Sequence, residues 1–204
     1  MILEWDPARP KKKATALIRE TLLNGGIIAY PTDTLYGMGC DLFSIKAIRQ
    51  LYLMKRLDGK KALSIICRDF KEISTYAVMS DYSFGLLKRL LPGPYTFVLQ
   101  ARKIMPKLLM TEKKEVGIRI PSHPAPVAIA ALIERPIINT SAKISGEAVF
   151  TDPKQIERTF RGSINLIIDG GIIAGEPSTV IRLTDDRVEV LRKGKGPVRD
   201  LLEG

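Results

Sequence analysis

Residues 27–39 read IIAYPTDTLYGMG, an apolar run that leads directly into a loop rich in hydroxyl groups and glycine. Residues 27–30 show no polar alternation, which is typical of a strand covered on both faces inside an α/β sheet. Small hydroxyls and glycine in the loop let backbone N–H groups approach a ligand, although a plain tight turn has the same composition. The segment therefore predicts a buried strand followed by a loop suited to anions.

Apolar spacing and turn residues predict how the rest of the chain folds. Residues 10–24 carry apolar side chains at helical spacing, and the following glycines end the helix where a positive φ is tolerated. Ser44 is the expected cap of a second helix, and Thr151 that of a later one. Further helices are expected at 80–91, 124–133 and 152–160, and strands at 63–67, 95–100, 115–120, 137–139, 166–168, 179–183 and 188–192.

The order of these elements predicts the fold class. Strands mixed with helices indicate a layered α/β sheet, and the short spacing within 95–120 and 179–192 indicates hairpins. The sheet is therefore expected to be mixed, with parallel and antiparallel neighbours, rather than doubly wound. We expect a single domain over residues 1–204, since no linker or internal repeat interrupts the chain.

Composition and cysteine usage exclude several classes of protein. With 45% hydrophobic and 26% charged residues, the chain has the makeup of an ordinary globular protein. Cys40 and Cys67 form no CxxC pair and have no histidine partners, so we expect reduced, buried thiols rather than a disulfide framework or a zinc site. The sequence has no secretory signal, and no apolar segment approaches the roughly 20 residues that a membrane-spanning helix needs. We therefore expect a cytoplasmic protein.

The charge balance favours anionic partners without identifying them. The chain has 32 Lys and Arg residues against 22 Asp and Glu residues, which gives a net charge of +10. Such an excess attracts phosphorylated or polyanionic molecules over a long range. It also serves solubility, so the charge by itself leaves a nucleic-acid role open.

Several common catalytic devices are absent from the sequence. It contains no GxxxxGK[ST], GxGxxG, HExxH or GxSxG motif. The one histidine, His123, lies at an expected helix start, where we predict a surface or capping role because the helix dipole disfavours an imidazolium there. The sequence therefore argues against a histidine-dependent triad.

Further polar loops and one arginine are candidates for binding anions. The loops NTSAKISG (139–146) and GEPST (175–179) repeat the hydroxyl-rich pattern, and residues 55–61 read KRLDGKK, which is either a solvated connection or a clamp on triphosphate oxygens. Arg119 interrupts the apolar strand 116–120. A buried arginine needs an anionic partner or a wet cleft.

Five motifs taken in order resemble the YrdC/YciO family, whose best-known members are threonylcarbamoyl-AMP synthases. They are PTDTLYGMG (31–39), RIPSHP (119–124), NTSAKISG (139–146), GEPSTVIRL (175–183) and VLRKGKG (190–196). The resemblance extends from about residue 10 to residue 200, essentially the whole chain. It implies a YrdC/RibB-like fold, a twisted mixed parallel/antiparallel sheet with helices around a basic concave cleft.

The resemblance also implies a reaction and its binding residues. Such nucleotidyltransferases condense L-threonine, bicarbonate and ATP with Mg²⁺ into threonylcarbamoyl-adenylate for tRNA modification, without a tightly bound organic cofactor or a metal held by the protein. Threonine would contact Thr34, Arg119, Asn139 and Ser178, with Arg119 on its carboxylate. Nucleotide would contact Lys55, Lys61, Ser141, Lys143 and Arg192, with Lys55 and Arg56 as catalytic cations.

Two departures from the synthase pattern keep other functions open. The synthases carry Lys-x-Arg where this chain has Lys55-Arg56-Leu57, and Ser-x-Asn where it has Ser141-Ala142-Lys143, and both changes resemble the YciO branch. One alternative is a double-stranded RNA or tRNA-binding module with weak or no synthase activity. Another is a synthase that uses an acceptor other than threonine. Downstream tRNA-modification proteins are further candidate partners.

Overall fold

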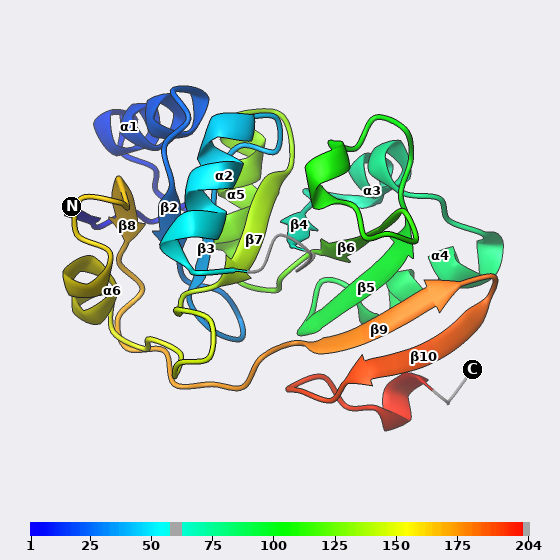
Figure 1. Cartoon of the computed structure of the whole chain (residues 1–204). Coiled ribbons are helices and arrows are strands. Elements are labelled where there is room, and N and C mark those ends of the chain that lie inside the picture. Colours follow the sequence, from blue (N-terminus) through cyan, green and yellow to red (C-terminus); the bar gives the residue numbers. More distant parts are fainter. Residues whose placement is uncertain (58–62, 202–204) are drawn as a thin grey trace.

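The computed structural model describes residues 1–57 and 63–201, in which ten strands form one sheet (Figure 1). The strands are β1 (Ile2–Leu3), β2 (Ile28–Tyr30), β3 (Gly37–Gly39), β4 (Ser64–Ile66), β5 (Tyr95–Gln100), β6 (Glu115–Arg119), β7 (Ile137–Ser141), β8 (Leu166–Ile168), β9 (Thr179–Thr184) and β10 (Arg187–Arg192). The helices are α1 (Lys12–Leu23), α2 (Ile45–Met54), α3 (Phe70–Tyr76), α4 (Asp81–Leu90), α5 (Pro124–Leu132) and α6 (Pro153–Thr159), with short 3-10 helices η1 (Lys107–Leu109) and η2 (Arg199–Leu201).

The strands follow the order β1-β8-β2-β3-β7-β4-β6-β5-β9-β10. The pairs β2–β8, β4–β6 and β5–β9 are parallel. The pairs β2–β3, β3–β7 and β4–β7 are antiparallel. The expected hairpins β5–β6 and β9–β10 are also antiparallel. The mixed α/β sheet that we expected is thus confirmed.

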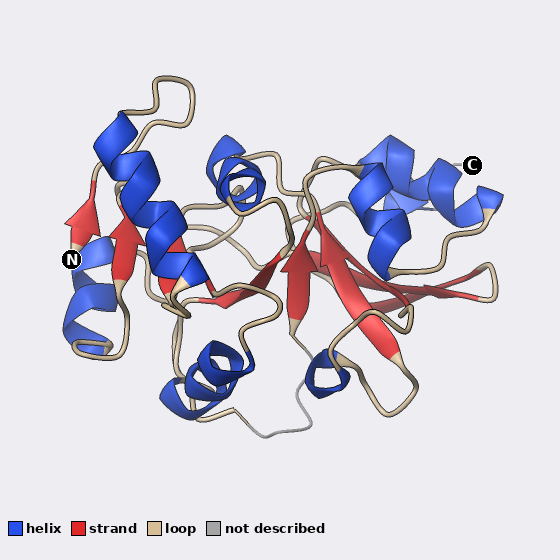
Figure 2. Cartoon of the chain, turned by 90° about the horizontal axis from the view of Figure 1, so that it is seen from above, coloured by secondary structure: helices blue, strands red, loops and turns tan. Residues whose placement is uncertain are grey.

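One half of the sheet is covered by helices on both faces, and Figure 2 shows helices on the two sides of the strands. Along β2, Ile28 and Tyr30 pack with α1 and α5, whereas Ala29 and the preceding Ile27 face the opposite core, to which α2 and α6 contribute. All four side chains are completely buried. Their two-sided burial is why this run is apolar without alternation.

The other half buries only one face of its strands. Phe97 of β5, Ile118 of β6 and Ile181 of β9 point into the core that α3 and α4 complete. Because successive strand residues point to opposite faces, the alternate residues of these strands point away from that core. Thr96, Gly117 and Val180 are among them, and they line a cavity.

Strand β3 was missed because its sequence, Gly37-Met38-Gly39, lacks the residues that favour strands. The structure requires these glycines, since β3 is pressed between two neighbouring strands. A Cβ on Gly39 would lie 1.7 Å from the carbonyl oxygen of Ile138, and one on Gly37 would lie 2.6 Å from the Tyr30 ring. What we expected to be only a ligand loop therefore also supplies a central strand.

Most helix ends follow the expected signals, with local exceptions. Ser44 caps α2, and Gly25 after α1 has a φ of 76°. The cap of α6 is Asp152, whose carboxylate accepts from the Lys154 amide at 2.8 Å, so the assignment to Thr151 was wrong by one residue. Strand β1 and helix α3 were not anticipated, because both segments are too short to show a clear period.

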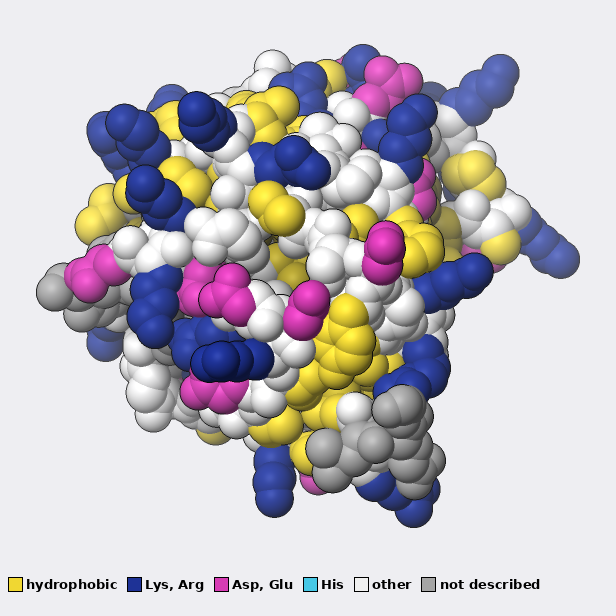
Figure 3. All heavy atoms as spheres, turned by 90° about the vertical axis from the view of Figure 1, so that its right-hand side faces the viewer, with side chains coloured by type: hydrophobic (Ala, Val, Ile, Leu, Met, Phe, Trp, Pro, Cys, Tyr) yellow, Lys and Arg dark blue, Asp and Glu magenta, His cyan; other side chains and the backbone are white. Residues whose placement is uncertain are grey.

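The two cysteines are free thiols, as we expected, and the surface carries dispersed charged side chains. Cys40 and Cys67 are buried free thiols, and burial raises the pKa of both. On the face shown in Figure 3, Lys and Arg side chains are dispersed, with Asp and Glu side chains among them. Within residues 1–57 and 63–201, no helix combines the length and apolar character that crossing a membrane requires.

The tight packing of β3 predicts opposite effects for two glycine substitutions. Gly39→Ala should lower the free energy of unfolding by about 3 kcal/mol or more, because a backbone carbonyl cannot move aside as a flexible side chain can. Gly85→Ala, in α4 with open space around its Cβ, should raise it by about 1 kcal/mol through helix propensity. Urea denaturation of both variants would check this. Equal effects would contradict the close approach of β3 and β7.

Candidate active site

A cavity of about 600 Å³ lies over the face of β5, β6 and β9 that the helices leave uncovered. Residues from distant parts of the chain line it, including the loop before β3, the end of α2 and the C-terminal end of β7. Five cationic side chains and one carboxylate are among its described lining residues. The basic concave cleft that we expected is therefore present.

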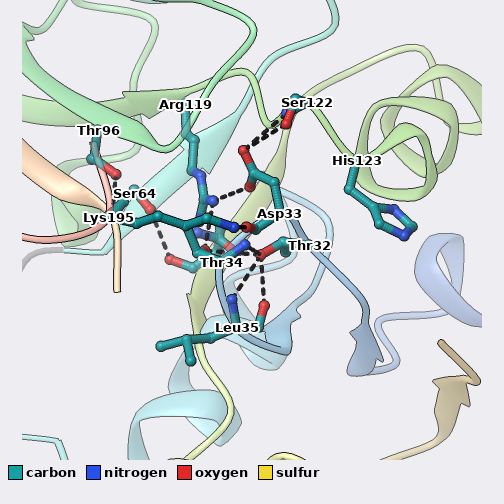
Figure 4. A network of polar contacts seen from close by, with 12 residues as sticks. Thr32, Asp33, Thr34, Leu35, Ser64, Thr96, Arg119, Ser122, His123 and Lys195 are labelled. Atoms are coloured by element: carbon teal, nitrogen blue, oxygen red, sulfur yellow. Dashed lines mark hydrogen bonds and ion pairs between the residues drawn. The ribbon is translucent and has the colours of Figure 1, made fainter. Parts of the chain in front are cut away.

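Arg119 ends β6 and is buried beneath this cavity, with only 5% of its surface exposed. Its Nη2 donates to the Asp33 carboxylate and, at 2.6 Å, to Thr34 Oγ1 (Figure 4). Its Nε is buried without a hydrogen-bond partner. Burial lowers the pKa of Arg119, and the Asp33 charge opposes that shift. The guanidinium is thus fixed by the hydrogen bonds of Nη2, while Nε can still donate to a further acceptor.

The loop after β2 is ordered by its own side chains. Thr32 Oγ1 accepts from the amides of Thr34 and Leu35 at 3.1 and 3.2 Å and donates to the Leu35 carbonyl at 2.6 Å. The second Asp33 oxygen accepts from both the amide and the hydroxyl of Ser122 at 3.1 Å (Figure 4). Asp33 therefore joins this loop to the end of β6 and the start of α5.

Ser178 and Arg192 form the wall contributed by β9 and β10. Arg192 donates from Nη2 to the Ser178 carbonyl at 2.8 Å, and Thr96 Oγ1 lies 2.8 Å from Ser178 Oγ. Burial and the charge of Arg119 both lower the pKa of Arg192. Two guanidinium groups thus repel each other across the cavity, and an anion between them would relieve that repulsion.

Asn139 fixes the opposite wall through buried hydrogen bonds. Its Nδ2 donates to Ser64 Oγ at 3.1 Å, and its Oδ1 accepts from the Tyr30 hydroxyl at 3.2 Å. Burial strongly raises the pKa of Tyr30, so this hydroxyl stays a donor. The amide is oriented by partners on both of its ends.

Lys55 holds the loop that follows β7. Only 1% of its surface is exposed, and its Nζ donates to the carbonyl oxygens of Ser141 and Lys143, to the latter at 2.6 Å. The Ser145 amide donates in return to the Lys55 carbonyl at 2.9 Å. The buried ammonium therefore shapes the wall that carries Ser141 and Lys143.

The structure brings most of the expected site residues into one cavity. Those lining it are Thr34, Lys55, Arg119, Asn139, Ser141, Lys143, Ser178 and Arg192. Arg56 is not among them. Its backbone has a φ of 51° just after the end of α2, its side chain is exposed, and the next residue, Leu57, lines the cavity instead. Lys61 lies outside the described residues.

Three charged residues of the site, Asp33, Glu115 and Arg182, lie outside the set expected from the motifs. Asp33 was not recognised as the ionic partner of Arg119, because 86 residues separate them. Glu115 and Arg182 were missed as lining residues, although a signal existed. Glu115, Gly117 and Arg119 alternate along one strand, so a period of two places all three on one face.

His123 caps α5, as we expected from its position. Its Nδ1 accepts from the Ala125 amide at 3.2 Å, which requires an unprotonated nitrogen. Burial lowers the pKa of His123 from its ordinary value of 6.5, and the Asp33 charge opposes this shift. Figure 4 shows the imidazole beside the network but directed away from Arg119.

Comparisons with known proteins agree with this architecture. A family model for Sua5, YciO and YrdC, described as "Telomere recombination", matches residues 20–194. The uncharacterised YciO protein of Escherichia coli strain K12 is 35% identical over 198 residues, 96% of each chain. The crystal structure of E. coli YciO matches with a TM-score of 0.92 and 32% identity over 98% of both chains.

Two further relatives have names or ligands that bear on function. A Methanocaldococcus jannaschii protein, provisionally named as a threonylcarbamoyl-AMP synthase, is 35% identical over 94% of this chain and 90% of its own. The crystal structure of P. abyssi Sua5 complexed with L-threonine has a TM-score of 0.91 and 29% identity. That match covers 98% of this chain and 59% of the Sua5 chain.

The buried pair predicts strong coupling between Asp33 and Arg119. Asp33→Asn should lower the free energy of unfolding by about 3 kcal/mol or more, because it leaves a buried charge uncompensated. Adding Arg119→Met should restore part of the loss in a double-mutant cycle measured by urea denaturation. Glu189→Gln is the control, since this carboxylate is 58% exposed where it pairs with Arg182, and it should cost about 1 kcal/mol or less. Additive losses for the first pair would contradict the coupling.

The cap of α5 predicts a pH dependence. Between the lowered pKa of His123 in the folded state and 6.5 in the unfolded state, the unfolded chain binds more protons, so stability falls as pH falls through this window. His123→Asn keeps a capping oxygen but does not titrate there. The wild type should lose stability relative to this variant between about pH 7 and about pH 5. A constant difference in unfolding free energy would contradict the assignment.

Proposed function

The chain belongs to the Sua5/YciO/YrdC family, which includes threonylcarbamoyl-AMP synthases, and from this membership we propose that it makes threonylcarbamoyl-adenylate from L-threonine, bicarbonate and ATP. The observation that carries the proposal is the buried Arg119, whose Nε has no hydrogen-bond partner and whose neighbours in the cavity are hydroxyl and amide groups. Such a donor is costly to bury unless an acceptor completes it.

In this proposal threonine binds at the Arg119 end of the cavity. Its carboxylate completes the hydrogen bonds of the guanidinium, an arrangement that arginine geometry favours. Thr34 and Ser178 offer hydroxyl groups beside Arg119, and Asn139 offers an amide. The P. abyssi relative that crystallised with L-threonine supports this choice of ligand.

The nucleotide binds next to threonine, along Ser141, Lys143 and Arg192. Lys143 and Arg192 supply positive charge for the phosphates, while Lys55 acts by holding the loop of Ser141 and Lys143. Mg²⁺ enters with ATP as part of the substrate. Since the described residues hold no cluster of three or more His, Cys, Asp and Glu side chains suited to a metal, we assign no protein ligand set to it.

The chemistry that we propose depends on positioned charges. The threonine amine attacks bicarbonate, a carbon–nitrogen bond forms and water leaves, which yields a carbamate. A carbamate oxygen then attacks the α-phosphorus of ATP, and the bond to pyrophosphate breaks. Arg119, Lys143 and Arg192 offset the charges of the assembled anions, so that no side chain is needed as a general base.

Pyrophosphate release tests the proposal. The purified chain with Mg²⁺ and ATP should release pyrophosphate only when L-threonine and bicarbonate are both present. Arg119→Lys should lower kcat/KM for threonine by about 10- to 100-fold, because lysine cannot make the paired hydrogen bonds. Arg158→Lys, on the exposed surface of α6, is the matched control and should have no effect.

Each contrary result identifies a different function. Release that depends on another amino acid would replace threonine as the acceptor. No release, together with filter retention of tRNA at low salt that is lost steeply as salt rises, would favour an RNA-binding module. We test this second function because the net charge of +10 favours binding to a polyanion such as RNA.

A further inference from the structure

The segment that follows β10 reaches the loop after β2 at the Arg119 end of the cavity. Lys195 lies in this segment, and its Nζ donates to the carbonyl oxygen of Asp33 (Figure 4). Lys195 follows β10 whereas Asp33 follows β2, so this hydrogen bond joins segments that are 162 positions apart in the chain. The proposed function does not use Lys195.

The backbone around Lys195 is fixed by hydrogen bonds to residues 177–179. The Gly194 amide donates to Thr179 Oγ1 at 3.0 Å, and this hydroxyl donates to the Gly196 carbonyl at 2.6 Å. The Lys195 amide donates to the Pro177 carbonyl at 2.9 Å. A Cβ on Gly194 would lie 2.2 Å from the Pro177 carbonyl oxygen, so the two backbones are in direct contact. The Lys195 side chain therefore extends from an ordered backbone.

Lys195 binds the peptide group that carries both partners of Arg119. This peptide joins Asp33, whose carboxylate pairs with Arg119, to Thr34, whose hydroxyl accepts from Arg119 at 2.6 Å. Lys195 donates to the carbonyl oxygen of the peptide, and its N–H, the Thr34 amide, donates to Thr32 Oγ1 at 3.1 Å. Because a peptide group is planar, hydrogen bonds at its two ends fix its orientation. The bond from Lys195 therefore bears on both Arg119 partners.

We propose that Lys195 is a positioning residue, which orients the peptide between Asp33 and Thr34 and thereby directs the Arg119 guanidinium at the carboxylate of the substrate. The effect on threonine rests on the proposed function, whereas the effect on the peptide does not. Lys195 is not among the residues that line the cavity, so it acts through Asp33 and Thr34. An ionised donor suits this role because it makes a stronger hydrogen bond than a neutral one.

The competing interpretation is that Lys195 makes an ordinary surface hydrogen bond and contributes only charge. The same segment offers a matched control, because Lys193 is also exposed and lies two residues away. A role of charge predicts equal effects when either ammonium is removed. A positioning role predicts an effect at Lys195 that arginine can restore, since a guanidinium also donates to a carbonyl.

Amide hydrogen exchange measured by NMR tests the inference without any substrate. Lys195→Met should speed exchange of the Thr34 amide by about fivefold or more, because its peptide loses one of two hydrogen bonds. Lys195→Arg and Lys193→Met should leave the Thr34 rate close to that of the wild type. The amide of Ile118, within β6, should exchange at the same rate in every variant, which separates a local effect from a loss of overall stability.

The same variants test the effect on substrate in the pyrophosphate assay. Lys195→Met should raise KM for L-threonine by about fivefold or more, because the carboxylate then meets a poorly oriented guanidinium. The values of kcat and of KM for ATP should change by less than about twofold, as expected when only binding of threonine is weakened. Lys195→Arg should restore KM for threonine, and Lys193→Met should not change it.

The outcomes separate this inference from the reaction. Unchanged exchange of the Thr34 amide in Lys195→Met, or equal effects of Lys195→Met and Lys193→Met, would overturn the role of Lys195. Faster exchange with an unchanged KM for threonine would overturn its link to the substrate. Faster exchange that Lys195→Arg reverses, in a protein that releases no pyrophosphate with threonine, would support the action of Lys195 on the loop and remove only the proposed reaction.

Discussion

The ion pair between Arg119 and Asp33 joins parts of the fold that are distant in the chain. Arg119 comes from β6, in the half of the sheet with one covered face, and Asp33 comes from the loop that links β2 to β3 in the other half. Both side chains are more than nine-tenths buried, so neither charge is stable without the other. Because Asp33 also binds Ser122, one carboxylate sets the relative positions of two loops and a strand end.

The cavity exists because the two halves of the sheet are covered differently. Strand β7 belongs to both halves, since Thr140 and Ser141 pair with β3 while Ile137 and Asn139 pair with β4. On the β3 side of β7, and at β4, helices cover both faces of the strands, whereas beyond β4 they cover one face of β6, β5 and β9. The polar residues that alternate with the core of β5, β6 and β9 are therefore left to line a hollow.

Much of this architecture could be predicted from local patterns, and the omissions have physical causes. The run at 27–30 predicted a two-sided strand because burial on both faces removes the need for polar residues. Strand β3 escaped because close approach of neighbouring backbones selects glycine, which ordinarily weakens a strand. The site motifs indicated which loops matter. The pairing of Asp33 with Arg119 could not be read from them, because it depends on which loops meet in three dimensions.

The outermost strands bear on how the molecule behaves among copies of itself. A sheet edge presents unpaired backbone groups that can recruit a strand from another chain. Here one edge, β1, is two residues long, and the other, β10, carries Arg187, Glu189 and Arg192 and has an irregular register between Val190 and Arg192. Shortness, charge and a local distortion each disfavour such recruitment, so both edges are protected against intermolecular β-aggregation.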